Sequence, residues 1–192
     1  MSLLATFREF LVQHNLQQEA SLAVAFSGGV DSHVLLHLCY QLKAEFPHFA
    51  VKAFHVNHGI SANADAWEKH CSDVCKQLQI PFQSTKLQIS KSKRTSLEAK
   101  ARAGRYTALA QMLAKDDVLL LGQHQQDQTE TLLLQLKRGA GPKGLSSMGS
   151  SGVIEADGKN INFLRPLLQV SKKEILSYAS EFELSWQDDE SN

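Results

Sequence analysis

The first candidate for chemistry is a short turn, SGGVDS at residues 27–32, between an apolar run and a helical pattern. If a strand ends before this turn and a helix begins in it, the free N–H groups of the helix's first turn form an anion site. Paired glycines let an anion approach the backbone closely, and serine hydroxyls can donate further hydrogen bonds. The turn therefore predicts a pyrophosphate site made mostly of backbone amides. Its candidate residues are Ser27, Gly28, Gly29, Val30, Asp31 and Ser32.

Asp31 is the one acidic residue in this turn, and its carboxylate would repel phosphate. A Mg²⁺ ion bridging the carboxylate and the phosphate oxygens would remove that repulsion, so the turn indicates a metal-bound nucleotide. The turn does not fit GxxxxGK[ST], which needs a phosphate-binding lysine, and it does not fit GxGxxG. The other interpretation is an ordinary strand-to-helix connection in which Asp31 caps the helix.

Two further polar stretches each follow an apolar run. They are FHVNHGIS at residues 54–61 and GQHQQDQTET at residues 122–131. A lone histidine is usually a surface or core residue, but in such a loop it could contact a nucleotide or only hydrogen-bond the turn. The candidate binding residues in the two stretches are His58, Gly122 and His124.

Asp127 and Glu130 lie three residues apart, on one face of the first turn of an expected helix. Acids at a helix start are common because the helix dipole favours them there. The motif that contains them also makes them candidates for a metal ligand and a general base, as set out below with the family resemblance.

The elements that must position these residues follow from an alternation of apolar runs and helical patterns. The alternation predicts an α/β fold, a doubly wound and mainly parallel five-stranded sheet with helices on both faces. The carboxyl ends of parallel strands share one edge of the sheet, where ligands bind, so the polar stretches are expected to meet there. The expected strands are 21–26, 50–56, 81–89, 117–122 and 162–168. The expected helices are 2–14, 31–46, 64–79, 96–115 with N-cap Ser96, 126–138 and 171–182 with N-cap Ser171, and 139–152 is an expected loop.

Composition limits the class of protein. The 192 residues are 43% hydrophobic and carry zero formal net charge, as in an ordinary globular domain. No apolar run of about eighteen residues is present, so we expect no membrane partner. Three cysteines are an odd and low number, which argues against a disulfide framework and predicts a cytoplasmic location. Cys71 and Cys75 share a helix face and are expected in the core, and His33 and His37 are expected to be solvated.

The motifs carry a resemblance to a known family. SGGVDS resembles the PP-loop of the ATP pyrophosphatases, whose fold is adenine nucleotide alpha hydrolase-like. The stretches HVNHGI, GQHQQDQTET and RGAGPKGLSSM then resemble, in order, the motifs HVNHGL, GHHxDDQxET and RGxGxxGLxxM of the tRNA(Ile)-lysidine synthetase branch. RPLL at residues 165–168 and WQDDESN at residues 186–192 also match in order, so the resemblance covers the chain from its first strand.

The resemblance implies a ligase that uses ATP and Mg²⁺. It would adenylate the O2 of the wobble cytidine in an isoleucine tRNA with a CAU anticodon and release pyrophosphate, then attach free L-lysine to C2 and release AMP. It implies Asp31 and Asp127 as metal ligands, and Asp31, Asp127 and Glu130 as catalytic residues. The implied tRNA-binding residues, at the end of a basic stretch and in the later glycine loop, are Arg105, Tyr106, Arg138, Gly139, Gly141 and Gly144.

Two departures from the family pattern keep alternatives open. Gln126 stands where the family has the first aspartate of its Asp-Asp pair. The chain stops after SN, so we expect an N-terminal PP-loop domain at residues 1–192 that lacks the C-terminal tRNA-binding domains. The alternatives are a tRNA thiolase of the same superfamily, a non-catalytic nucleotide- or tRNA-binding module, and a small-molecule synthetase. The sequence leaves the oligomeric state open.

Overall fold

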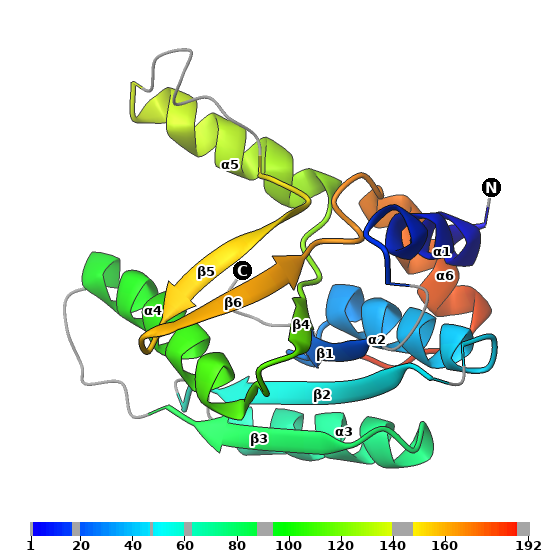
Figure 1. Ribbon diagram of the computed structural model, residues 1–192. Coiled ribbons are helices and arrows are strands. Elements are labelled where there is room, and N and C mark those ends of the chain that lie inside the picture. The colour runs from blue at the N-terminus through cyan, green and yellow to red at the C-terminus, as the bar shows by residue number, and fades with distance from the viewer. Residues whose placement is uncertain are drawn as a thin grey trace.

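The computed structural model describes residues 2–16, 20–46, 48–59, 63–87, 94–139 and 148–187, with the backbone alone for 94–99. Figure 1 shows one sheet with helices packed on both of its faces. The strands are β1 Ser21–Ala25, β2 Ala50–Asn57, β3 Phe82–Lys86, β4 Asp117–Leu120, β5 Ser151–Ala156 and β6 Lys159–Leu164. The helices are α1 Leu3–Gln13, α2 Val30–Lys43, α3 Ala64–Gln77, α4 Arg94–Met112, α5 Gln125–Lys137 and α6 Lys172–Glu181.

The strand order is β3-β2-β1-β4-β6-β5, and every neighbouring pair is parallel except β5 with β6. The chain moves outward from β1 to β2 and β3, then returns to the other side of β1 with β4. The carboxyl ends of β1 and β4 therefore flank the topological switch point, where α/β sheets bind their ligands. The prediction of a doubly wound, mainly parallel sheet is confirmed.

Two apolar layers hold the sheet. One lies between the sheet and α1, α2, α3 and α6, and the other lies beneath α4. Leu22, Ala23 and Val24 of β1 have no exposed surface, because both faces of this central strand are covered. Within the described residues, no helix is long and apolar enough to cross a membrane.

The sheet has six strands among the described residues, one more than expected. The additional strand β5 begins inside the stretch expected to be a loop and pairs with β6 as a hairpin. Asp157 and Gly158 connect the two strands with φ values of 55° and 68°, and positive φ at both central residues is the type I′ geometry that matches strand twist.

Two smaller expectations are wrong. α4 begins at Arg94, so Ser96 lies inside the helix and is not its N-cap. His33 and His37 are buried and not solvated, because α2 packs against the sheet on one side and against α1 and α6 on the other. Cys71 and Cys75 are buried in the core, as expected.

Candidate functional site

The glycine turn follows β1 and leads directly into α2, whose N-cap is Gly29. Gly28 has a φ of 93°, and a Cβ there would lie 3.0 Å from Cys71 Sγ, so both its conformation and its close packing require glycine. The Ser32 hydroxyl donates to the Gly29 carbonyl at 3.0 Å and lies 3.0 Å from the Ser27 hydroxyl. The two serines therefore brace the turn internally, and the backbone N–H groups of the first turn of α2 are the groups that an anion could use.

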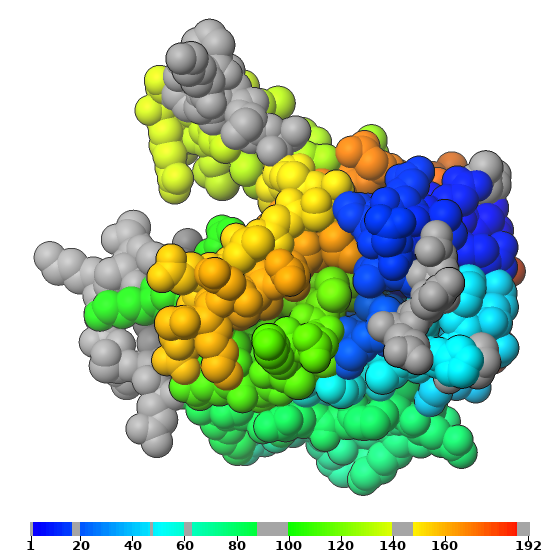
Figure 2. Space-filling model, in the orientation of Figure 1, coloured from blue at the N-terminus to red at the C-terminus, as the bar shows by residue number. Residues whose placement is uncertain are grey.

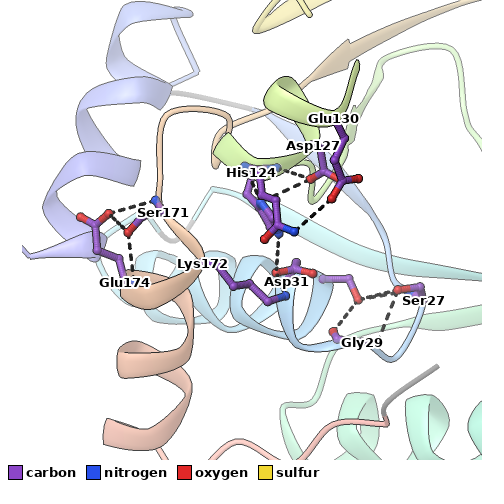
Figure 3. Close-up of polar contacts among 11 residues, drawn as sticks. Ser27, Gly29, Asp31, His124, Asp127, Glu130, Ser171, Lys172 and Glu174 are labelled. Carbon is purple, nitrogen blue, oxygen red and sulfur yellow. Dashed lines mark hydrogen bonds and ion pairs between the residues drawn. The ribbon is translucent and has the colours of Figure 1, made fainter. Parts of the chain in front are cut away.

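Gly122 brings the loop after β4 against the start of α2. A Cβ on Gly122 would lie 3.3 Å from the Ser32 backbone nitrogen and 3.4 Å from the Asp31 carbonyl carbon. A side chain here would press on the backbone of α2, so glycine favours the close approach of the two segments. The contact places His124, two residues later, beside Asp31 (Figure 3).

Asp31 is the centre of the site. Its Oδ1 lies 2.7 Å from Lys172 Nζ and 3.4 Å from His124 Nε2. The carboxylate is 29% exposed, whereas the His124 side chain is 7% exposed. Three segments that are distant in sequence therefore meet at one oxygen atom: the start of α2, the loop before α5 and the first residue of α6 (Figure 3).

The hydrogen bonds of His124 fix the tautomer of its ring. The Gln126 backbone N–H donates to Nδ1 at 3.1 Å, so this nitrogen is the acceptor and the ring proton lies on Nε2, facing Asp31. Asp127 Oδ2 accepts from the His124 backbone N–H at 2.7 Å and so caps α5. Its separation of 3.5 Å from Nδ1 is not an ion pair, because Nδ1 carries no proton.

Glu130 lies one turn further along α5 and is exposed. The Gln126 side chain donates to Glu130 Oε1 at 3.0 Å. Gln126, the residue that departs from the family motif, therefore fixes the side chain of Glu130 one turn later. The ring of His124 lies between Asp31 and Asp127, which are the two carboxylates predicted to share a metal.

A second set of contacts fixes the loop after β4 to the segment after β6. Backbone hydrogen bonds join Leu121 to Leu164 and Gln125 to Val170 at 2.9 and 3.1 Å. Arg165 adds a side-chain bridge, because its Nε donates to Gln123 Oε1 at 3.0 Å and its Nη1 donates to the Gly149 carbonyl at 2.8 Å.

Burial lowers the pKa of Arg165, whose guanidinium also lies 4.3 Å from the centre of the Phe163 ring. Sequence reasoning named the RPLL motif and did not identify Arg165 or Lys172 as residues of the site. The order of the strands is what brings them there, and no local pattern contains that information.

The loop after β2 lies at the same edge of the sheet and carries the half-buried His58. Asn57 shapes this loop: its Oδ1 accepts from the Gly59 backbone at 2.9 Å, and its Nδ2 donates to Asp65 and Glu68. His55 lies within β2 and donates from Nδ1 to the Phe26 carbonyl at 2.9 Å, which ties β2 to the strand before the glycine turn.

Of the residues predicted to bind tRNA, those that the structure describes are on α4 and at the end of α5. Arg105 and Tyr106 are on α4, and Arg138 is at the C-terminal end of α5, the helix that projects from the body in Figure 1. Gly139 has a φ of 72° and ends that helix. Gly141 and Gly144 lie outside the described residues.

The comparison with protein families matches residues 3–192 to the model described as PP-loop domain. The chain belongs to the PP-loop domain family. The glycine turn at residues 27–32, whose sequence resembles a PP-loop, lies at the carboxyl end of β1, beside the switch point.

Curated relatives and solved structures extend this finding. The chain is 47% identical to "tRNA(Ile)-lysidine synthase" of Serratia proteamaculans over 89% of this chain and 38% of that protein. It is 44% identical to the protein of that name in Histophilus somni, over 94% of this chain and 42% of that protein. The chain therefore spans about two fifths of the length of these relatives.

Among solved structures, the U34-tRNA thiolase NcsA of Methanococcus maripaludis superimposes with a TM-score of 0.76. The match covers 97% of this chain and 65% of that one, at 19% identity. At this identity the likeness shows that the two proteins share the PP-loop fold.

Proposed function

We propose that this chain is the nucleotide-using domain of a tRNA(Ile)-lysidine synthetase. The observation that carries the proposal is the joining of Asp31, His124 and Lys172 beside an anion-binding turn. This arrangement occurs in a chain 44–47% identical to two proteins named for that activity. The reaction would ligate lysine to C2 of the wobble cytidine of an isoleucine tRNA with a CAU anticodon.

In the first step, the PP-loop amides bind the β- and γ-phosphates of ATP, and the cytidine O2 attacks the α-phosphorus. The bond from the α-phosphorus to the bridging oxygen breaks, and pyrophosphate leaves. The Asp31 carboxylate stands at the anion site, and one of its oxygens faces Lys172 and His124. A carboxylate in this place fits the role of a Mg²⁺ ligand. Mg²⁺ would supply neutralisation of the charge on the phosphoryl oxygens.

In the second step, the neutral amine of free L-lysine attacks the activated C2, and AMP leaves with the former O2. The amine must lose a proton, and Asp127 or Glu130 is the proposed base. Asp127 also remains the proposed second metal ligand. Such a ligand role would require its carboxylate to leave its present cap on α5 or to use its other oxygen.

The tRNA would be bound by residues outside the Asp31 cluster, on α4 and beyond the end of α5. The proposed contacts are Arg105, Tyr106, Arg138, Gly139, Gly141 and Gly144. A cytoplasmic location is part of the proposal, because both tRNA and free lysine are available there.

A tRNA thiolase that uses a cysteine-bound cluster fits this chain less well. Cys39, Cys71 and Cys75 are all buried, and burial raises the pKa of the Cys71 and Cys75 thiols to about 12. Metal or sulfur chemistry needs accessible thiolates, and these thiols are neither exposed nor ionised.

The test is ATP–pyrophosphate exchange with Mg²⁺, with and without tRNA carrying a CAU anticodon, on this chain and on Asp31→Asn. Exchange that requires the tRNA and is lost in the variant supports adenylation of a tRNA base. Exchange without tRNA would instead indicate a small-molecule substrate. ATP binding with no exchange under either condition would favour a binding module.

A further inference from the structure

Lys172 is the one charged residue of the Asp31 cluster that the proposed chemistry leaves without a role. It is the first residue of α6, and its side chain is 36% exposed. A capping box fixes the start of this helix: Ser171 Oγ accepts from the Glu174 N–H, and Glu174 Oε2 accepts from the Ser171 N–H at 2.9 Å. The Lys172 backbone is therefore held at a defined place above the PP-loop.

The ion pair of Lys172 with Asp31 has a consequence for charge. An acid at a helix N-terminus that binds anions must itself be neutralised before phosphate approaches. In the structure Lys172 performs that neutralisation at 2.7 Å. Once a metal ion takes the Asp31 carboxylate, the ammonium loses its partner while it remains half-buried, and an unpaired half-buried charge is unfavourable.

The nearest replacement anions at that moment are the phosphate oxygens in the PP-loop. That loop contains no lysine of its own, unlike GxxxxGK[ST] loops, in which a lysine reaches the β- and γ-phosphates. The Lys172 ammonium reaches from the start of α6 to Asp31 at the start of α2, beside the turn that is proposed to bind the phosphates (Figure 3).

We infer that Lys172 is a phosphate-binding residue that Asp31 holds in place until the metal–nucleotide complex arrives. On binding, the carboxylate passes to the metal and the ammonium passes to the β- or γ-phosphate oxygens. The inference rests on the proposed function and extends it by naming a residue that recognises the triphosphate. It also predicts the direction in which the loss of Lys172 changes the affinity for nucleotide, and that direction can be measured.

The test compares Lys172→Met with Lys172→Arg by calorimetric titration with Mg–ATP and, separately, with Mg–pyrophosphate. If Lys172 binds phosphate, Lys172→Met weakens both affinities about tenfold to a hundredfold, the range for a lost hydrogen bond to a charged group. Lys172→Arg retains the charge and stays within about threefold of the parent chain, since guanidinium also binds phosphate.

The competing role predicts the opposite sign. If Lys172 only neutralises Asp31, Lys172→Met frees the carboxylate for the metal, and both affinities stay the same or become tighter. That result overturns the inference. The matched control is Lys173→Met, which removes an exposed lysine one residue further along the same helix and should leave both affinities unchanged.

Failure of the proposed function gives a different pattern. If the parent chain itself binds neither Mg–ATP nor Mg–pyrophosphate, the nucleotide site is wrong, and the inference falls with it. If the parent chain binds both and Lys172→Met binds them equally well, the inference alone is wrong. Far-UV circular dichroism of each variant confirms that a loss of affinity is not a loss of fold.

Discussion

His124 makes two separate contacts, and a single substitution can remove one of them while keeping the other. Its Nδ1 accepts from the Gln126 backbone and so caps α5, while its Nε2–H faces Asp31 across 3.4 Å. Asparagine is a good N-cap residue because its short side chain also presents an acceptor to these N–H groups. It cannot reach Asp31, so the substitution separates the structural contact from the contact in the site.

We expect His124→Asn to keep the free energy of unfolding within about 1 kcal/mol of the parent chain while reducing ATP–pyrophosphate exchange about tenfold or more. His124→Ala should lose both the cap and the contact. Urea denaturation and the exchange assay measure the two effects separately. Equal exchange in His124→Asn and the parent chain would show that the Nε2 contact is not used.

Gly122 provides a second test at the scale of one residue. A methyl group there would press on the backbone of Ser32 and Asp31, which cannot rotate away as a side chain would. Gly122→Ala should therefore cost about 1–3 kcal/mol and weaken Mg–ATP binding, because the start of α2 must shift.

The matched control for Gly122→Ala is Gly104→Ala, inside α4. There the added methyl group meets only the end of the Leu87 side chain at 3.3 Å, and alanine favours the helix. This variant should be neutral or more stable by up to about 1 kcal/mol. Thermal unfolding of both variants is the measurement. An equal change in stability for Gly122→Ala and Gly104→Ala would contradict the importance of the close approach at Gly122.

At the scale of elements, α5 differs from every other helix that the structure describes, because none of its residues is buried. Figure 2 shows it standing clear of the body, and it exposes four leucines in its second half. These are Leu132, Leu133, Leu134 and Leu136. Among the described residues, its start is joined to the rest of the domain through His124, Gln125 and Gln128.

The exposed position of α5 predicts that its leucines contribute little to the stability of this chain. Leu133 is 58% exposed, and Leu133→Ala should change the free energy of unfolding by about 0.5 kcal/mol or less. Leu38 in α2 has no exposed surface, and Leu38→Ala should cost about 2–5 kcal/mol. Urea denaturation of both variants is the measurement, and a similar loss in the two would show that α5 packs in solution.

The sequence predicts the helices and strands well where a local pattern of apolar residues is enough to identify them. The four parallel strands β1 to β4 each lie within an expected strand or overlap it, because apolar runs bounded by helical patterns leave few alternatives. β5 was missed, although the Asp-Gly pair at residues 157–158 is a strong hairpin signal. Glycine and serine at its start concealed it, since both residues are also typical of loops.

The sequence also predicts only part of the site, because a local pattern identifies some of its residues and not others. Asp31 and His124 each follow a strand in a recognisable polar stretch, so their meeting follows from the rule for parallel sheets. Lys172 could not be found in this way, because its contact with Asp31 joins residues 141 positions apart. The buried state of His37 depends likewise on the packing of α6 against α2, where its Nδ1 lies 2.9 Å from the Tyr178 hydroxyl, and helical periodicity alone does not reveal this contact.

The whole molecule should lose stability in mild acid because of its buried histidines. Burial lowers the pKa of His33 to about 4, and it also lowers the pKa of His37 and His55. Between pH 6.5 and pH 4 the unfolded chain therefore binds more protons than the folded chain, so the free energy of unfolding falls as the pH falls. For His33 alone the loss reaches about 3 kcal/mol at pH 4.

His33→Gln should reduce this dependence. Glutamine can still donate to the Ser185 carbonyl, which accepts from His33 Nδ1 at 2.7 Å, but it does not titrate. Urea denaturation at several pH values between 4 and 7 should show a shallower slope for His33→Gln than for the parent chain. His48→Gln removes an exposed imidazole and serves as the control. An unchanged slope in His33→Gln would contradict the assignment.

The long span between Asp31 and Lys172 also has a consequence during synthesis on the ribosome. A chain grows at about 5–20 residues per second, and its early segments emerge long before its late ones. The glycine turn with Asp31 emerges first, whereas Lys172, the cation that pairs with its carboxylate, follows 141 residues later. A nascent chain therefore carries an incomplete Asp31 cluster for several seconds, until α6 has emerged and docked.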